Sequence, residues 1–142
     1  MLSRKRRTYI LIRGDARLRR ELAREITDAY PVSEVEAPHN GLVMMKMRET
    51  ARNSLFYLGE LLVSEAKVAV GNSFGLGVIA GNDPEAALDL AVIDAACNAG
   101  LPETAAWDSL LLDMEKTITS RRAVEDAKIS QTLVSFETMV ET

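Results

Sequence analysis

The sequence predicts an α+β fold, with helices at both ends of the chain and an antiparallel sheet between them. Three observations predict it: apolar residues recur at helical spacing before residue 31, alternate with a period of about two over residues 32–81, and return to helical spacing afterwards. At 142 residues the chain has the length of one ordinary domain. Its 47% hydrophobic and 27% charged content argues against a disordered or fibrous chain. We therefore treat residues 1–142 as a single domain.

Two helices are expected at the N-terminal end. The first covers residues 4–13 and stops at Gly14, a residue suited to a left-handed helix end. Asp15 is placed to cap the free N–H groups of the second helix. The apolar residues of this second helix recur at helical spacing until Pro31 marks its end.

Four strands are expected, over residues 32–37, 42–48, 54–70 and 74–80. The third is too long to stay straight, and Gly59 is the natural place for a bend or bulge. Short turns at residues 38–41 and 71–73 suit an antiparallel meander, because parallel neighbours would need long crossovers. The only histidine, His39, is expected in the first of these turns, exposed to solvent.

A buried helix is expected at residues 83–99, with a long helical segment after it. Asp83 can cap this helix, Pro84 fits its first position, and Gly100 ends it. Because the helix is apolar on nearly every face, it should pack against the sheet on one side and another element on the other. Residues 119–131 carry only a narrow apolar stripe, so residues 119–142 are predicted to project as a helical arm.

The predicted core draws on the helices and on all but the first of the expected strands. Asp94 lies inside the apolar helix and is expected to be a paired structural residue. The single cysteine, Cys97, cannot form an internal disulfide. The core residues expected from the pattern are Leu22, Ile26, Val43, Met45, Phe56, Val68, Val70, Val78, Leu90 and Ile93.

The net charge of -4 conceals an asymmetry between the N-terminal segment and the rest of the chain. Residues 1–24 carry a charge of +7 and the remainder -11. A basic segment on an acidic body could bind nucleic acid, dock on an acidic partner, or fold back on its own or a sister chain. Without aromatic interleaving, an RNA-binding signature or zinc-finger spacing, we expect no nucleic acid. With no membrane-length apolar run and no signal-peptide pattern, a cytoplasmic protein without membrane contact is expected.

Motifs that carry chemistry are sparse. Gly75, Gly77 and Ala80 satisfy G-x-G-x-x-A, but the surrounding pattern continues a strand, so close backbone packing is the preferred interpretation. No Gly-Lys-Ser/Thr occurs, which argues against a phosphate-binding P-loop. His39 and Cys97 give too few ligands for a His/Cys metal site. We expect no catalytic residue, cofactor or metal in this chain.

Several short motifs occur in order along almost the whole chain. In the middle they are Gly41-Leu42-Val43, Phe56-Tyr57-Leu58-Gly59-Glu60, Val63-Ser64-Glu65-Ala66, Gly75, Gly81-Asn82-Asp83 and Ala91-Val92-Ile93-Asp94-Ala95. At the ends they are Arg7 with Tyr9, and Val134-Ser135-Phe136-Glu137-Thr138-Met139-Val140. This order resembles the G subunit (PhnG) family of the bacterial carbon-phosphorus lyase complex. The residues that carry the family motifs are Gly59, Glu60, Ser64, Gly75, Gly81, Asp83 and Asp94.

The resemblance implies a subunit of an assembly that, with its H, I and L companions, takes ATP and an alkylphosphonate. Phosphonate displaces adenine and gives ribose 1-alkylphosphonate 5-triphosphate, after which a J subunit cleaves the carbon-phosphorus bond. Nucleosidase activity is attributed to the I subunit, and no catalytic group is assigned to the G subunit. The expected partners are therefore the I-type subunit, the H and J subunits, and a second copy of this chain. The expected interface residues are Arg7, Tyr9, Val134, Phe136, Met139 and Val140.

Two departures from the family pattern remove positive charge. Glu65 stands where the family has the Arg of Thr-Arg-Cys, and Asn82 where it has the Arg of Gly-Arg-Asp. If those arginines contact phosphate or acidic partners, the contact is weakened or reversed here. The alternative function is a free-standing protein that binds a small anion or nucleotide at residues 81–83. The carboxylate of Asp83 argues against this alternative, because it occupies the same N–H donors.

Replacing Phe136 with Ala is expected to reduce assembly more than the stability of the fold, because an interface anchor contributes to binding. Size-exclusion chromatography with the partner subunits measures the assembly. An unchanged complex would contradict the assignment of Phe136 as an anchor.

Overall fold

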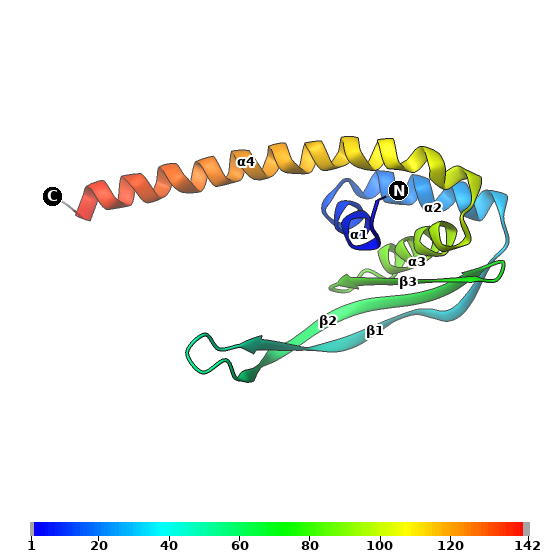
Figure 1. Ribbon diagram of the computed structural model, residues 1–142, viewed down its shortest axis with the longest axis horizontal. Helices are drawn as coiled ribbons and strands as arrows, with labels where there is room; N and C mark the ends of the chain where they lie inside the picture. Colours follow the sequence, from blue (N-terminus) through cyan, green and yellow to red (C-terminus); the bar gives the residue numbers. More distant parts are fainter. Residues whose placement is uncertain (1, 141–142) are drawn as a thin grey trace.

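The structure is a computed structural model that describes the backbone of residues 2–140 and the side chains of residues 2–131. Helices lie over one face of an antiparallel sheet, and the last helix extends far beyond the body (Figure 1). The expected α+β class with a long C-terminal helix is confirmed. The elements in chain order are α1 (Arg4–Arg13), α2 (Ala16–Ala29), β1 (Val32–Arg48), β2 (Leu55–Val70), β3 (Ser73–Ala80), α3 (Pro84–Ala99), the 3₁₀ turn η1 (Pro102–Ala106) and α4 (Trp107–Val140).

The two N-terminal helices match their expected ranges. Asp15 caps α2, and its Oδ1 accepts the Arg17 N–H at 3.0 Å. Helix α1 ends at Arg13, but Gly14 is extended, with a φ of -81°, rather than left-handed as expected. Glycine is needed here for close packing, because a Cβ at this position would lie 2.6 Å from Met114 Cγ. The glycine therefore lets α4 pass close to the end of α1.

The sheet has three strands in the order β1-β2-β3, not the four expected. The segments expected as separate strands at 32–37 and 42–48 form one strand, β1, with register irregularities on either side of Glu36. Pro38 is tolerated there because β1 is an edge strand, where a missing N–H breaks no inner ladder.

His39 therefore lies in a strand and not in a turn. Its Nε2 is 3.2 Å from Glu65 Oε2 on β2, and its Nδ1 is 2.9 Å from the Ala37 carbonyl oxygen. The hydrogen bond to Ala37, with help from the Glu65 charge, raises the pKa of His39 above its ordinary value.

The bulge expected at Gly59 is present. Met45 pairs with Gly59 and Lys46 with Tyr57, so Leu58 is the extra residue on β2. Beyond this bulge the β1–β2 hairpin continues away from the body (Figure 1).

Helix α3 packs directly on β3. Gly75 and Gly77 face it so closely that a Cβ on either would collide with backbone atoms of Ala91 and Ala87, respectively. This confirms backbone packing as the role of the G-x-G pattern. Gly100 ends α3 in the left-handed conformation, with a φ of 66°, as expected.

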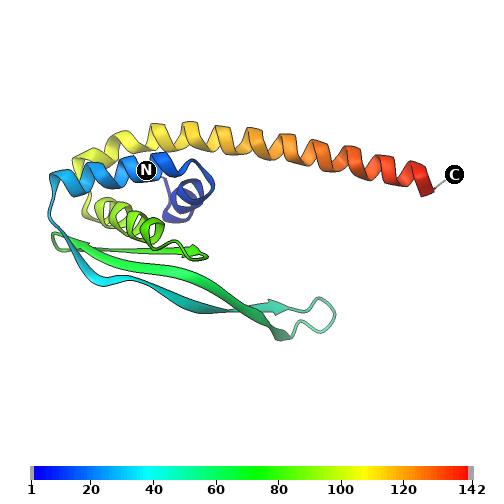
Figure 2. The ribbon, with the colours of Figure 1, turned by 180° about the vertical axis from the view of Figure 1, so that it is seen from behind.

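The core lies between α3, the body half of β2, and helices α1, α2 and α4. Of the predicted core residues, Leu22, Ile26, Val68, Val70, Leu90 and Ile93 are buried and Val78 is half-buried. The prediction was wrong for Val43, Met45 and Phe56, which are 41%, 38% and 45% exposed. These residues alternate as expected, but within the described backbone no helix covers that part of the hairpin (Figure 2).

Helix α4 is attached to the body by its first three turns. Trp107 is buried and its Nε1 donates to Glu25 Oε2 at 3.0 Å, while Leu111 and Ile118 join the core. Every described side chain from 119 to 131 is exposed. With 34 residues, α4 is about 50 Å long at 1.5 Å per residue. It projects in the same general direction as the hairpin (Figures 1 and 2).

Gly77→Ala is expected to lower the free energy of unfolding by about 3 kcal/mol, because the new methyl group must push α3 away from β3. Gly41→Ala is the matched control in β1, where the nearest atoms to a Cβ are those of the Glu65 carboxyl group at 3.6–3.7 Å. Urea unfolding followed by circular dichroism measures both. Equal midpoints for the two variants would contradict the role given to Gly77.

Candidate functional site: exposed ribbon, helical arm and an arginine-lined hollow

Arg7, expected at a partner interface, lies inside the subunit. Its side chain is only 8% exposed, and Nη2 is 2.8 Å from Asp94 Oδ1. The other Asp94 oxygen accepts from Arg4 Nη2 at 2.8 Å and from the Leu76 N–H at 3.0 Å. Asp94 is therefore a paired structural residue, as expected, and it joins α1, α3 and β3. Arg7 thus holds α1 on the body, and its assignment to a partner interface stays a prediction.

Ser64, Gly81 and Asp83, far apart in the sequence, meet at the start of α3. Ser64 is fully buried, and its Oγ donates to the Gly81 carbonyl oxygen at 2.8 Å and accepts the Asp83 N–H at 2.8 Å. Asp83 Oδ1 accepts the Ala86 N–H at 3.1 Å. These family-motif residues thus connect β2 to the β3–α3 junction. The chain's own groups occupy the donors that a small anion would need here, which disfavours the alternative function at residues 81–83.

The most exposed apolar surface lies on the far half of the β1–β2 hairpin. We call residues 42–62 the distal ribbon: Leu42–Arg48 of β1, Leu55–Leu62 of β2 and the turn between them. Its large apolar residues are between 38% and 64% exposed. They are Leu42, Val43, Met44, Met45, Met47, Leu55, Phe56, Tyr57, Leu58, Leu61 and Leu62. Gly59 and Glu60 of the family motif lie within this ribbon.

Both faces of the distal ribbon are apolar. Cross-strand partners share a face, so Val43 lies beside Leu61 on one side and Leu42 beside Leu62 on the other. Met47 lies beside Phe56 on the first of these faces. Both edges are also open in the described part of the chain, since β1 pairs only with β2, and β3 pairs only with residues 63–70 of β2. Apolar patches of this extent mark interaction sites.

Sequence reasoning missed this surface by assigning its residues to the core. The signal that could have found it is apolar character at both odd and even positions of 42–47 and 55–62. A strand covered on one side only needs apolar residues at every second position. A strand that is apolar on both sides must be covered on both, and the helices of residues 2–140 are too few to do so.

The arm predicted to carry partner contacts is the outer part of α4. Val124 and Ile129 are 55% and 58% exposed on it. The backbone of Val134, Phe136, Met139 and Val140 belongs to α4, but their side chains lie outside the described residues. Their assignment to a partner interface stays a prediction.

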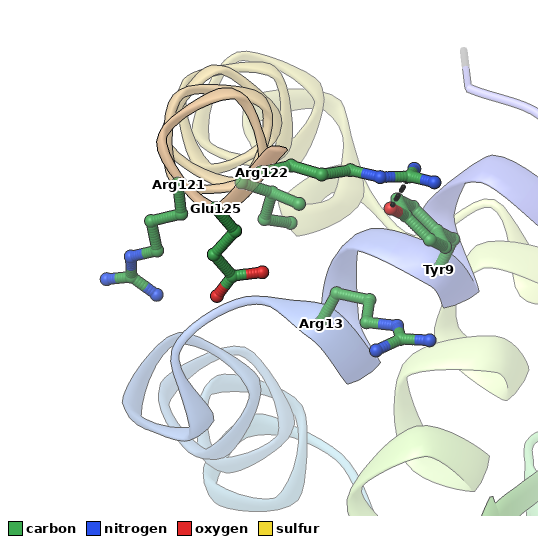
Figure 3. Close-up of a pocket in the computed structure, with 6 residues that line it drawn as sticks. Tyr9, Arg13, Arg121, Arg122 and Glu125 are labelled. Carbon is green, nitrogen blue, oxygen red and sulfur yellow. Dashed lines mark hydrogen bonds between the residues drawn. The ribbon is translucent and has the colours of Figure 1, made fainter. Parts of the chain in front are cut away.

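Tyr9, the remaining expected interface residue, lies at a hollow where α1 meets α4. The hollow has a volume of about 490 Å³, and Tyr9 is 39% exposed at its edge. Arg122 Nη1 donates to the Tyr9 hydroxyl at 3.4 Å (Figure 3). The other lining residues are Arg13, Ile118, Arg121 and Glu125.

The comparison with protein families agrees with this arrangement of motif residues. The family model "Phosphonate metabolism protein PhnG" matches residues 2–141. The chain belongs to the PhnG family. Among curated proteins, none matches the chain. The resemblance read from the ordered motifs is thereby confirmed for essentially the full length.

The two residues expected to depart from the PhnG pattern lie in different surroundings. Glu65 lies on β2 beside His39, and its Oε2 is 3.2 Å from His39 Nε2. Asn82 is exposed at the β3–α3 junction. In this PhnG protein, therefore, one departure is tied into the sheet and the other faces solvent.

The described part of this PhnG chain contains neither a metal-binding cluster nor a membrane-spanning helix. Among those residues, no group of three or more His, Cys, Asp or Glu side chains is arranged to hold a metal ion. No helix within that part is both long and apolar enough to span a membrane.

Asp94→Asn is expected to lower the free energy of unfolding by about 3–5 kcal/mol, because it leaves the buried Arg7 guanidinium without its counter-charge. Glu115→Gln is the control. It breaks an exposed ion pair between Glu115 on α4 and Arg6, which lies on α1 as Arg7 does. Chemical unfolding should show a large shift in midpoint for the first variant and a small one for the second. Similar shifts would mean that burial of Arg7 does not set the effect.

Proposed function

We propose that this chain is a non-catalytic subunit of the carbon-phosphorus lyase core complex. In that role it supports formation of α-D-ribose 1-alkylphosphonate 5-triphosphate from ATP and an alkylphosphonate, with release of adenine. The chain's PhnG membership supports a role in phosphonate metabolism. The proposal places the reacting groups of this transferase step in partner subunits.

The observation that carries the subunit role is the distal ribbon. A free-standing protein rarely exposes a large contiguous apolar surface, and this ribbon exposes two faces at once. Interfaces of stable complexes are enriched in aromatic residues and Met, which this ribbon provides in Phe56, Tyr57 and its methionines. Its open edges add unpaired backbone groups that a partner strand could extend. We propose the I-type subunit as the principal partner, with the H and J subunits and a second copy of this chain as further contacts.

The contacts of the motif residues within the body also support the subunit role. The motif residues Ser64, Gly75, Asp83 and Asp94 are used in packing, capping or pairing within the chain. Their contacts hold α3 and the sheet in place, and so set where the ribbon and the arm emerge. The motif residues therefore stabilise the body from which the distal ribbon and the outer part of α4 project.

Phe56→Glu is expected to abolish or strongly weaken co-purification with the I-type subunit, because burying a carboxylate in an apolar interface is unfavourable. Thermal stability of the isolated chain should change little, since Phe56 is 45% exposed. Light scattering behind a sizing column measures the mass of the mixture.

Phe74→Glu is the matched control. Phe74 is also an exposed phenylalanine, 56% accessible, but it lies on β3, outside the distal ribbon. Equal loss of the complex in both variants would remove the ribbon's special role. A wild-type chain that stays monomeric beside the partner would contradict the subunit proposal itself.

A further inference from the structure

The hollow between α1 and α4 is positively charged, although the protein has a net charge of -4. Arg13 reaches it from the last turn of α1, and Arg121 and Arg122 reach it from α4. Glu125 supplies the one carboxylate of its lining. With three guanidinium groups and one carboxylate, the lining carries a formal charge of +2.

These arginines differ from those nearby on α1. Arg4 and Arg7 are paired with Asp94, and Arg6 donates to both oxygens of Glu115. In the described part of the chain, by contrast, Arg13, Arg121 and Arg122 form no ion pair with a carboxylate. The positive charge in the hollow is thus left for a group from outside.

The arrangement of the three guanidinium groups indicates what kind of group fits. Figure 3 shows Arg121 and Arg122 leaving α4 on opposite sides, with Arg13 extending from the end of α1 on the same side as Arg122. A single carboxylate could contact only part of this set. Arginine forks match phosphate oxygens, and a chain of phosphates carries charge along its length. The Tyr9 hydroxyl accepts from Arg122 and still has a proton to donate to an oxygen.

We propose that the hollow between α1 and α4 binds a small anion carrying two or more adjacent phosphate groups. Its volume of about 490 Å³ is in the range of small-molecule sites. The proposal concerns this chain alone and does not depend on the proposed subunit function. The site is separate from residues 81–83, where internal hydrogen bonds use the available donors.

Glu125 allows a second test, in which the expected change in binding affinity is opposite to that of the arginine variants. Its carboxylate points toward α1, between the Arg121 and Arg13 side chains in Figure 3. There it opposes an anion, so removing its charge should strengthen binding while removing an arginine weakens it. A purely structural role for these residues would not produce opposite effects on one ligand.

The experiment is calorimetric titration of the full chain with inorganic tripolyphosphate at low ionic strength. Arg13→Ala and the double variant Arg121→Ala/Arg122→Ala are each expected to weaken binding at least about tenfold, the size of one lost charge-assisted hydrogen bond. Glu125→Gln should bind more tightly than the unmodified chain. Added salt should weaken binding in every case.

Helix α2 offers a matched control. Its surface residues Arg17, Arg20, Glu21 and Arg24 have the same charge composition as the hollow, but they all lie on one helix. Arg17→Ala/Arg24→Ala should leave the affinity unchanged. Equal weakening in this control would reveal non-specific attraction and overturn the proposal. Absence of tripolyphosphate binding would also overturn the proposal. Tighter binding of a hexaglutamate peptide than of tripolyphosphate would overturn it too, and would assign the hollow to an acidic protein segment.

Discussion

The fold depends on how closely α3 can approach β3 and on the charge buried beside that contact. Gly75 and Gly77 remove the side chains that would separate helix from strand, and Asp94 lies on the same helix. Its carboxylate accepts from the Leu76 N–H and from Arg4 and Arg7. Helix α1 is thereby fixed to the sheet through α3. Since α4 packs beside α1, with Met114 close to Gly14, the direction of the arm follows from the same contacts.

The small size of the body explains why much of the sheet is left uncovered. One helix, α3, lies directly on the sheet, and it covers the part where β2 carries Ala66, Val68 and Val70. The hairpin is longer than this helix can cover, and β3 pairs with β2 only over residues 63–70. The molecule therefore has two kinds of apolar residue: those that stabilise the subunit, and those of the distal ribbon that remain available to a partner.

Much of the fold could be predicted from the sequence because local signals were strong. The capping residues Asp15 and Asp83 and the left-handed Gly100 mark helix ends through local contacts, which do not depend on the rest of the fold. The turn predicted at Pro38 was wrong. A proline is tolerated within a strand if the strand lies at the edge of the sheet, and this position is a property of the whole sheet. Burial of Phe56 was predicted wrongly for a similar reason. Alternation defines faces, but only tertiary structure says what covers them.

The candidate site was predictable only in part. Asp94 was expected to be paired, yet its partner Arg7 was assigned to an outer surface, because sequence does not reveal which of many arginines meets a buried carboxylate. The hollow has no sequence signature, since Arg13 and the Arg121–Arg122 pair are more than a hundred residues apart and meet through the packing of α1 against α4. Ordered motifs identified the family without locating either surface.

The distal ribbon also has a consequence for how the protein is made. A two-stranded segment with apolar faces and open edges is a template for pairing with any other extended chain, including another ribbon of the same kind. A newly synthesised copy is therefore prone to aggregation until the ribbon is covered. If the proposed partner covers the ribbon, production of the two chains in step protects it, and a surplus copy exposes a surface on which chaperones and proteases act.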